Sequence, residues 1–531
     1  MFMRLLRLRV PGGAWKVPFE KGGLMRKFLW ATVLLVVGGA RLLAEDPISL
    51  KDFTFNAYGS FEFHGENVHN EQDFRSAQND ARRSGFSRTR LGLETVVTSD
   101  IAGRLEIVRG PNIGGILNSD AQYGTPPRDV NREISNFFVE NAYVEVKHFL
   151  GVDLLRIGRQ YLGRPGDLLV YYGPLNDNIM TVRSLQAIAV KKQFGPLQAQ
   201  IATAKPFVES AIPQPGPAGD AATELTNTLG GGSVDLYYAF INSDQLFKQT
   251  VGKLELEAGV YRGVDKNSPA SNDSNALNIY DGRVKFFIPL PWGTDVIALS
   301  AEAALNDGAD RGTEFDAFAV PLTTTTGVRR NYNGHAYVVK AAYDWRAVVT
   351  THGLYASSSG DRNPGDHRID GFRDFASVGR SPGASFGSPG SDFRYGKIYH
   401  DNANLGFGPG LDTSAYGDFG VELLNLGVEV TPPWAENRLT FTMDFFDART
   451  GVEIPDGAPR RIMQELDAAV RYKHSPNATL ELGAAQLHPF DRLQVIRSAA
   501  LGRTVNGHDK ILMAYFNVTV KFGLPEELLS Y

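Results

Sequence analysis

The dominant feature of this chain is a strict alternation of apolar and polar residues, first clear at residues 142–147, which read AYVEVK. A period of two places successive side chains on opposite faces, so this stretch is predicted to be a β-strand. Residues 154–160, LLRIGRQ, continue the alternation after a short connection, which predicts an antiparallel hairpin. A hairpin with one apolar face and two unpaired edges is not stable alone, so further strands must complete its sheet.

The same alternation recurs along nearly the whole chain and predicts about 18 strands. They lie at about residues 53–64, 87–98, 102–110, 134–149, 153–162, 180–194, 197–206, 233–243, 250–262, 276–289, 294–306, 335–345, 346–359, 419–433, 437–448, 464–474, 479–488 and 508–522. The connections between these strands alternate between short and long. The short ones are residues 99–101, 151–152, 195–196, 244–249, 291–293, the junction 345–346, 434–436 and 475–478, and the long ones include 65–86, 111–133, 163–179, 207–232, 307–334 and 360–418. Short periplasmic turns opposite long extracellular loops are typical of outer-membrane barrels, whereas a β-sandwich has no reason to sort its loops by length.

Within the predicted strands one face is apolar and the other is polar. In residues 87–98, Leu91 and Leu93 share one face, while arginines and a glutamate share the other. Only a closed sheet can place an apolar face in lipid without leaving edges unsatisfied. We therefore predict an all-β, transmembrane, up-and-down antiparallel barrel over residues 45–522 in a bacterial outer membrane, with a short tail at 523–531. The alternative is a soluble protein whose apolar face is an ordinary core.

Residues 1–44 have the features of a leader and signal peptide. A basic pair after Met25, the expected start, precedes an apolar run of about 13 residues, and Ala44 marks the expected cleavage site. The run is shorter than a spanning helix requires. Removal of the leader takes eight of the 54 basic and one of the 59 acidic residues, leaving a net charge near −12 that argues against nucleic acid as a partner. The chain has no Cys, which excludes a disulfide framework and a thiol nucleophile.

The last predicted strand resembles the C-terminal signal of outer-membrane proteins, which implies an outer-membrane insertion machinery as a partner. Aromatic and β-branched residues alternate with polar ones from Phe516 to Phe522. The signal either ends at Phe522, with a tail beyond it, or uses Tyr531 as its terminal aromatic residue. The alternation stops at Phe522, which favours the internal signal.

Charged side chains on the polar face are predicted to point into the lumen. They are Arg88, Arg90, Arg104, Arg156, Arg283, Lys285, Lys340, Arg471, Glu94 and Glu145, together with Arg183 if Val182, Ile188 and Val190 face lipid. Strict alternation aims Arg159 at lipid, unless the end of its strand turns to the rim. Rings of Arg and Lys favour anions, because their fixed charge acts in a confined and poorly screened space. The alternative is that opposite charges on neighbouring strands pair and stiffen the wall.

Residues 360–418 form the longest predicted loop. A loop of this length either folds into the mouth as a constriction or lid, or remains a mobile surface loop. Asp361-x-Asn363 begins like a calcium loop, but the Gly and the distal Glu are not at the required spacing. The sequence has no HExxH motif and no phosphate loop, and its His residues show no catalytic pattern. We therefore predict no enzyme activity, no cofactor and no metal site.

The first hairpin resembles a known family. NAYVEVK at residues 141–147, LRIGRQYLG at residues 155–163 and an arginine on the following strand, Arg183, are similar to the alginate-export porin family, whose members are 18-stranded barrels. A later match runs from Gly451-Val452-Glu453 to Glu465-Leu466-Asp467 and Tyr472, and then through the strand from Leu480 to Phe490; it is similar to the late hairpin of that family.

This resemblance implies passive movement of an anionic polysaccharide or another anion through an arginine-lined lumen, with Arg156, Arg159 and Arg183 as pore residues. The acidic mature chain and its inward carboxylates depart from that pattern, so a general or weakly selective porin is the alternative.

The sequence thus predicts a channel, or porin, for passive diffusion or export of a polar, anionic solute such as an acidic saccharide. Two alternatives from other classes are a plugged barrel that acts in adhesion or as an envelope scaffold, and an outer-membrane hydrolase with catalytic residues at the rim. The expected partners of a channel are the lipid bilayer, lipopolysaccharide and the transported solute.

Overall fold

The computed structural model describes most of the chain after residue 52. The described ranges are 53–71, 74–76, 81–109, 137–163, 171–172, 184–205, 234–242, 253–265, 275–291, 295–310, 314–315, 324–325, 330–362, 368–373, 396–399, 419–453, 457–501 and 504–523. Residue contacts divide the chain into Met1–Phe53 and Thr54–Tyr531, and every element below belongs to the second unit. The predicted leader at residues 1–44, with its cleavage site, lies outside the described residues.

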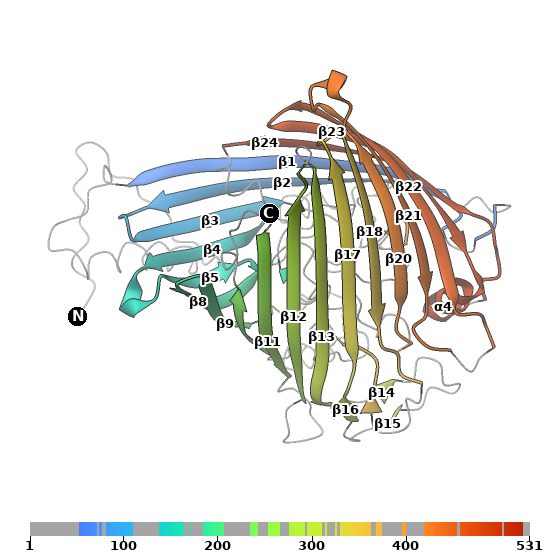
Figure 1. Cartoon of the computed structure of the whole chain (residues 1–531), viewed down its shortest axis with the longest axis horizontal. Coiled ribbons are helices and arrows are strands. Elements are labelled where there is room, and N and C mark those ends of the chain that lie inside the picture. The colour runs from blue at the N-terminus through green and yellow to red at the C-terminus, as the bar shows by residue number, and fades with distance from the viewer. Residues whose placement is uncertain are drawn as a thin grey trace, which may run out of the picture. The chain divides into compact units, whose positions relative to one another are not determined.

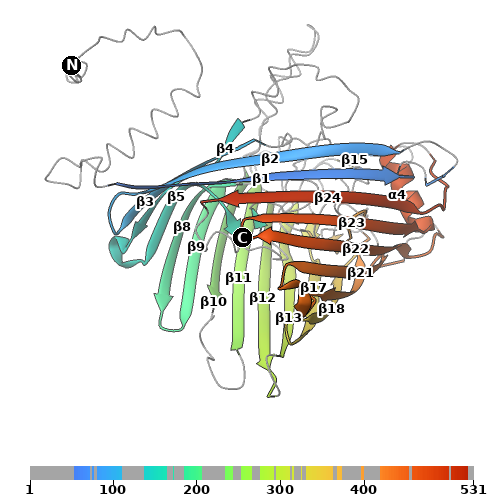
Figure 2. The same ribbon diagram turned by 90° about the horizontal axis from the view of Figure 1, so that it is seen from above.

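One sheet of 20 strands dominates the second unit. Figure 1 and Figure 2 show its strands running side by side. Two of these strands, β16 (Arg330–Tyr332) and β19 (Arg368–Ile369), are short, so the other 18 form the wall. The wall strands are β1 (Thr54–His69), β2 (Arg82–Val96), β3 (Ile101–Arg109), β4 (Phe137–Lys147), β5 (Leu154–Gln160), β8 (Leu185–Phe194), β9 (Leu197–Lys205), β10 (Val234–Asn242), β11 (Lys253–Asp265), β12 (Asn275–Pro289), β13 (Val296–Asp310), β17 (His335–Trp345), β18 (Val349–Ser358), β20 (Glu422–Val430), β21 (Leu439–Arg449), β22 (Arg461–Ser475), β23 (Ala478–Pro489) and β24 (Ile511–Phe522).

Antiparallel pairing runs around the whole wall. Each wall strand pairs with the next wall strand along the chain. The first strand, β1, also pairs antiparallel with the last, β24, from Gly59 opposite Phe522 to His69 opposite Leu512. The sheet therefore closes on itself as an up-and-down barrel, which removes the unsatisfied edges that an open sheet would expose.

Short elements lie in the connections. In the long connections, β6 (Leu162–Gly163) pairs with β7 (Tyr171–Tyr172), β14 (Glu314–Phe315) pairs with β15 (Thr324–Thr325), and β16 pairs in parallel with β19. A helix, α4 (Asp491–Leu501), lies between β23 and β24, and the turns contain η3 (Phe149–Gly151) and η5 (Pro433–Ala435). Among the described residues, no helix has both the length and the apolarity needed to span a bilayer.

Several turns at one end of the wall are tight. Between β17 and β18 the chain reverses through Arg346 and Ala347, which both have a φ of 54°. Between β8 and β9 it reverses at Gly195, whose φ of 60° costs a glycine little. The connections at the opposite end contain more residues between consecutive wall strands. The sorting of connections by length therefore follows the predicted pattern.

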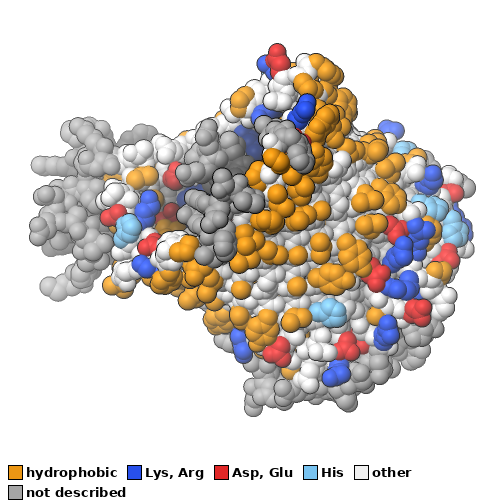
Figure 3. Space-filling view, in the orientation of Figure 1, with side chains coloured by type: hydrophobic (Ala, Val, Ile, Leu, Met, Phe, Trp, Pro, Cys, Tyr) orange, Lys and Arg blue, Asp and Glu red, His pale blue; other side chains and the backbone are white. Residues whose placement is uncertain are grey.

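The outer face of the wall is apolar. Large exposed side chains on it include Leu91, Leu93, Ile157, Ile188, Ile201, Leu256, Val260, Leu299, Val339, Leu426, Met443, Leu466, Leu482 and Phe516. Figure 3 shows hydrophobic side chains spread over the strands on the face in view, while many charged side chains lie toward the end that carries α4. Exposed aromatic residues near the short turns, such as Trp434 at 75% exposure, match the interfacial girdle of membrane barrels.

Aromatic rings pack over glycines where the barrel closes. On the outer face, Phe522 covers Gly59 and Phe516 covers Gly65, and each ring occupies the space that a Cβ on its glycine would need. Such cross-strand pairs let a ring lie flat on the sheet and cover a stretch without side chains. The seam between β1 and β24 therefore has specific side-chain packing in addition to its backbone ladder.

The predicted all-β barrel fold is confirmed, since each predicted strand overlaps a wall strand. The strand ends differ from the predicted ones, because β1 continues to His69 and β22 begins at Arg461. The helix α4 was not predicted. Its apolar residues do not form a clear helical stripe, and it is held by tertiary contacts, including the buried Leu493 and Arg492.

Candidate functional site: the lumen wall

The inner face of the barrel carries the charged side chains that the sequence analysis selected. Alternation with the exposed apolar residues places the following on this face: Arg88, Arg90, Glu94, Arg104, Glu145, Arg156, Arg283, Lys285, Lys340 and Arg471. Of the two remaining candidates, Arg183 lies outside the described residues. The other, Arg159, donates from Nε to the Ser184 hydroxyl at 2.7 Å, close to the end of β5.

A network of buried polar groups joins β1 to β5. The Glu106 carboxylate is fully buried, accepts a bond of 2.7 Å from the Tyr58 hydroxyl, and lies 2.9 Å from Arg104 and 3.2 Å from Arg90. The Tyr161 hydroxyl donates to Glu106 at 3.0 Å. A buried charged group is costly without partners, so Glu106 and these two arginines stabilise one another.

A bulge brings a second carboxylate into this network. The register of β3 and β4 shifts between Glu106 and Ile107, and Glu140 lies at the extra position in β4. The Glu140 carboxylate is fully buried, contacts the Tyr161 hydroxyl and lies 3.8 Å from Arg90. A bulge is needed because strict alternation would not place Glu140 and Asn141 together on the buried side.

Further arginine pairs continue around the wall. Arg88 pairs with Glu62, and Arg156 pairs with Glu145 while it stacks 4.6 Å from the centre of the Tyr143 ring. On the far side of the seam, Arg471 lies 2.9 Å from Glu481. Carboxylate partners across or along the strands are thus present for Arg88, Arg90, Arg104, Arg156 and Arg471, whereas Arg159 bonds to the Ser184 hydroxyl. For those five arginines the expected pairing of opposite charges is observed.

A polar row crosses the closing seam in register. Glu66 lies 3.1 Å from His64 Nε2, the other ring nitrogen of His64 contacts Asn517, and Asn517 donates to Glu481 at 3.4 Å. The row ends at Arg471 on β22. Four strands are therefore joined through side chains inside the barrel, on the opposite face from the aromatic pairs of the seam.

A second group of basic residues lies on β12 to β18. Lys285, Ser300 and Lys340 occupy directly opposite positions on β12, β13 and β17. Next to them Arg283 lies between two carboxylates, 3.0 Å from Glu257 and 3.8 Å from Glu302.

These residues line a cavity of about 450 Å³ on the inner face. The cavity floor contains small residues, Ala298 and Ala342, which leave space above the sheet. His352 is a polar residue of the cavity lining, and its Nε2 lies 2.7 Å from Asp444. The Asp444 carboxylate also accepts a hydrogen bond of 3.1 Å from Asn425. Among the described residues, no cluster of His, Asp and Glu has the arrangement of a metal site.

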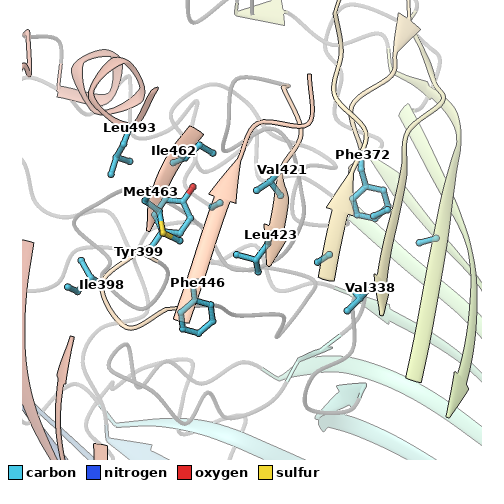
Figure 4. Close-up of a cluster of buried hydrophobic side chains, with 14 of the residues drawn as sticks. Val338, Phe372, Ile398, Tyr399, Val421, Leu423, Phe446, Ile462, Met463 and Leu493 are labelled. Atoms are coloured by element: carbon cyan, nitrogen blue, oxygen red, sulfur yellow. The ribbon is translucent and has the colours of Figure 1, made fainter. Parts of the chain in front are cut away.

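Two described parts of the predicted loop at 360–418 lie inside the barrel, residues 368–373 and residues 396–399. Asn306 on the inner face of β13 exchanges two hydrogen bonds with the backbone of Arg373, at 2.9 and 2.7 Å. The second part, residues 396–399, bonds to Glu465 and Asp467 on β22. Figure 4 shows Ile398 and Tyr399 beside Met463, with Leu493 and Phe446 in the same buried cluster. For these two parts the inward-folding interpretation of the loop is the correct one.

Sequence reasoning missed several residues of the lumen wall. Tyr58, Glu62 and Glu140 contact arginines of β2 and β3, and Tyr161 bonds to Glu106 and Glu140, yet none of the four was selected. The alternation that selected Arg88 would also have found Tyr58 and Glu62. It could not have found Glu140, whose position depends on the bulge.

A closed antiparallel barrel with an apolar outer face, a charged inner face and connections sorted by length is the architecture of outer-membrane channels. Neither a family model nor a curated protein matches the chain. Among solved structures, it is similar to OccAB1 of Acinetobacter baumannii, with 11% identity and a TM-score of 0.52 over 88% of this chain and 97% of that one.

Two similar structures from Pseudomonas aeruginosa are OccK8 (OprE), with 10% identity and a TM-score of 0.49, and opdK, with 11% identity and a TM-score of 0.48. In both comparisons the matched region covers 88% of this chain and 98% of the other chain. At such identities the likeness shows the fold alone, that of a large outer-membrane porin barrel. The resemblance to the alginate-export family is not confirmed by these comparisons.

Proposed function

We propose that this protein is an outer-membrane channel through which polar solutes cross by passive diffusion, with no covalent step. The observation that carries the proposal is the contrast between the two faces of one closed sheet. The outer face presents large apolar side chains to lipid, and the inner face presents buried and half-buried charged groups. Lipid and lipopolysaccharide would surround the first, and solute would pass along the second.

We further propose a preference for anions, with an acidic saccharide as the candidate substrate class. The support comes from the wall of β12 to β18, where Arg283, Lys285 and Lys340 line a cavity with hydroxyl and amide groups at Ser300 and Asn425. Ammonium and guanidinium groups offer donors to a carboxylate, and hydroxyl and amide groups suit sugar oxygens. The sequence resemblance to alginate-export porins, in which Arg156, Arg159 and Arg183 would line the pore, favours the same class.

A general porin with weak selectivity is the second candidate. The pairing of arginines with carboxylates in β1 to β5 favours it, because a paired charge contributes little net field to the lumen. The two candidates differ in one measurable property, the sign and size of ion selectivity.

Planar-bilayer recordings with the purified, folded protein test the proposal. We expect stepwise conductance, which heat-unfolded protein should not produce. Protein that is folded but never conducts would reject the channel and favour the plugged adhesion or scaffold barrel. Reversal potential in a salt gradient then separates the two channel candidates: preference for anions supports the first, a value near zero supports the general porin, and preference for cations rejects anion selectivity.

A further inference from the structure

The outer face of the wall changes character toward the long connections. In its middle part Leu426, Met443 and Leu466 are between 44% and 54% exposed. Further along β21, strand register sets Asp447 opposite the exposed Leu424, so a carboxylate lies on the lipid-facing side. Figure 3 shows basic, acidic and histidine side chains together at this end, which carries α4. Long connections are extracellular in such barrels, so this charged band lies at the level of the outer leaflet.

Two arginines share the Asp447 carboxylate. Arg449 donates from Nε and Nη2 to Oδ2, both at 3.0 Å, and Arg461 donates from the same two nitrogens to Oδ1, at 2.9 and 2.7 Å. The Arg461 guanidinium also lies 4.5 Å from the centre of the Phe490 ring. The side chains of Arg449 and Arg461 are 54% and 38% exposed, whereas Asp447 is 8% exposed. One carboxylate balances one of the two guanidinium charges, so the pair presents a positive surface rich in N–H donors.

Further basic groups lie beside this pair. His488 follows the exposed Leu482 at an even spacing on β23, so it also lies on the outer face. The charged groups that act on His488 are Arg461, Lys510 and His508. Lys510 is exposed and directly precedes β24. The positive surface thus extends from β21 across β22 and β23 to the start of β24.

Other carboxylates at this end have partners of their own. Glu422 lies 2.8 Å from Arg460, and Asp509 accepts two hydrogen bonds from Ser76. We define the basic patch as Arg449, Arg461 and Lys510 together with Asp447. It contains three basic side chains and one carboxylate, so its net charge is positive.

We propose that the basic patch binds a phosphate group of lipopolysaccharide, the phosphorylated glycolipid of the outer leaflet, with the acyl chains of the lipid over Met443 and Leu466. Guanidinium groups bind phosphate oxygens through paired N–H donors, and basic clusters beside an apolar membrane surface suit anionic lipid head groups. The position of the patch favours a membrane lipid over a soluble anion, because its arginines lie directly beyond exposed leucine and methionine on the outer face. The inference requires an outer-membrane barrel but does not depend on whether the barrel conducts.

The first test measures lipid binding by native mass spectrometry of the folded protein in detergent, with lipid A that carries two phosphates as the probe. We expect the affinity to fall by about tenfold in the double variant Arg449→Gln/Arg461→Gln, which loses charge-assisted bonds to phosphate. Arg262→Gln should leave it unchanged, because Arg262 lies on the outer face of β11 at the same end, 3.2 Å from Asn278 and away from the patch. Equal affinity in the wild type and the double variant would overturn the inference.

A single variant guards against misfolding of the double one. Lys510→Gln changes an exposed side chain before β24 and should lower the affinity by roughly twofold to threefold. Heat-modifiable gel migration shows that each variant is folded. If only Lys510→Gln folds, an affinity equal to that of the wild type would also overturn the inference.

The second test asks whether phosphate and acyl chains are both recognised. Lipid A without its phosphates should bind the wild type about tenfold more weakly, and its affinity should not differ between the wild type and the double variant. Inorganic phosphate at a concentration equal to that of lipid A should not displace the lipid, because it makes no apolar contact with the wall. Equal binding of the phosphate-free lipid, or full displacement by inorganic phosphate, would reject a lipopolysaccharide site.

Discussion

Individual arginines in the lumen wall owe their positions to carboxylates on the same or the neighbouring strand. Arg104 and Arg90 approach Glu106, and Arg156 shares its register position with Glu145 across β4 and β5. Because the barrel interior is partly desolvated, a charged side chain there is stable only with a partner. The effect of one arginine on a passing ion therefore depends on whether its carboxylate remains.

Replacement of one member of the Arg156–Glu145 pair should shift ion selectivity in opposite directions. Arg156→Gln leaves Glu145 uncompensated and should raise cation permeability, whereas Glu145→Gln leaves Arg156 uncompensated and should raise anion permeability. We expect changes of roughly twofold, since both side chains are about a quarter exposed or less. Reversal potential measures both variants, and the double variant should return near the wild type. Equal shifts of the same sign would contradict the pairing.

Among the elements, β1 and β24 join the two ends of the wall and have specific side-chain contacts on both faces. Their outer face has Phe516 over Gly65 and Phe522 over Gly59, and Phe63 lies 5.4 Å from Phe516 between ring centres. Their inner face has the polar row through His64 and Asn517. The seam thus uses one set of contacts toward lipid and another toward the lumen.

Phe516→Ala should weaken the seam by about 1–2 kcal/mol, since it removes ring packing from Gly65 and Phe63 while the ring is partly exposed to lipid. The expected readout is a lower temperature for conversion of the folded, fast-migrating gel band to the unfolded one. Phe441→Ala is a suitable control, because Phe441 has similar exposure but lies on β21, away from the seam. A conversion temperature lowered equally in both variants would argue against a special role of the seam.

The connection between β23 and β24 is tied to the connection after β1. Asp509 accepts hydrogen bonds of 2.7 and 2.6 Å from the hydroxyl and the backbone N–H of Ser76, and these bonds hold the pKa of Asp509 below its ordinary value. A carboxyl whose folded-state pKa is lowered stabilises the folded state above its unfolded pKa, and that stabilisation is lost as the pH falls through the folded value.

Hydrogen–deuterium exchange at the Ser76 amide should report this pH dependence. We expect protection at about pH 7 that falls below about pH 4, after correction for the intrinsic exchange rate. In Asp509→Ala the protection should be lost at every pH, whereas Asp491→Ala, in the first turn of α4, should leave it unchanged. Protection that persists in Asp509→Ala would show that other contacts hold the loop.

At the scale of the whole molecule, closure is a property of all 18 wall strands together. Removal of residues 511–531 would delete β24 and expose the edges of β1 and β23, so we expect this truncated chain to lose heat-modifiable gel migration and channel activity. Removal of residues 524–531 alone should preserve both, because the pairing ends at Phe522. Failure of the shorter truncation would indicate that Tyr531 supplies the insertion signal.

Much of the fold follows from local pattern. Alternation located the strands because a two-residue period is imposed by strand geometry itself, and it placed Leu91 outside and Arg90 inside correctly. Connection lengths implied an up-and-down barrel. The helix α4 and the bulge at Glu140 were beyond this reasoning, because neither has a local signal that outweighs its tertiary contacts.

The sequence by itself determined the all-β barrel and which face of each strand meets lipid, since both depend on periodicity along one strand. Tertiary structure alone decided which charged groups of the lumen wall pair with one another. Whether Arg156 is paired depends on the register of β4 and β5, and the position of residues 396–399 depends on Glu465 and Asp467, which lie far from them in sequence. Pairing between distant residues is set by strand register and loop path, and a period along one strand carries no information about either.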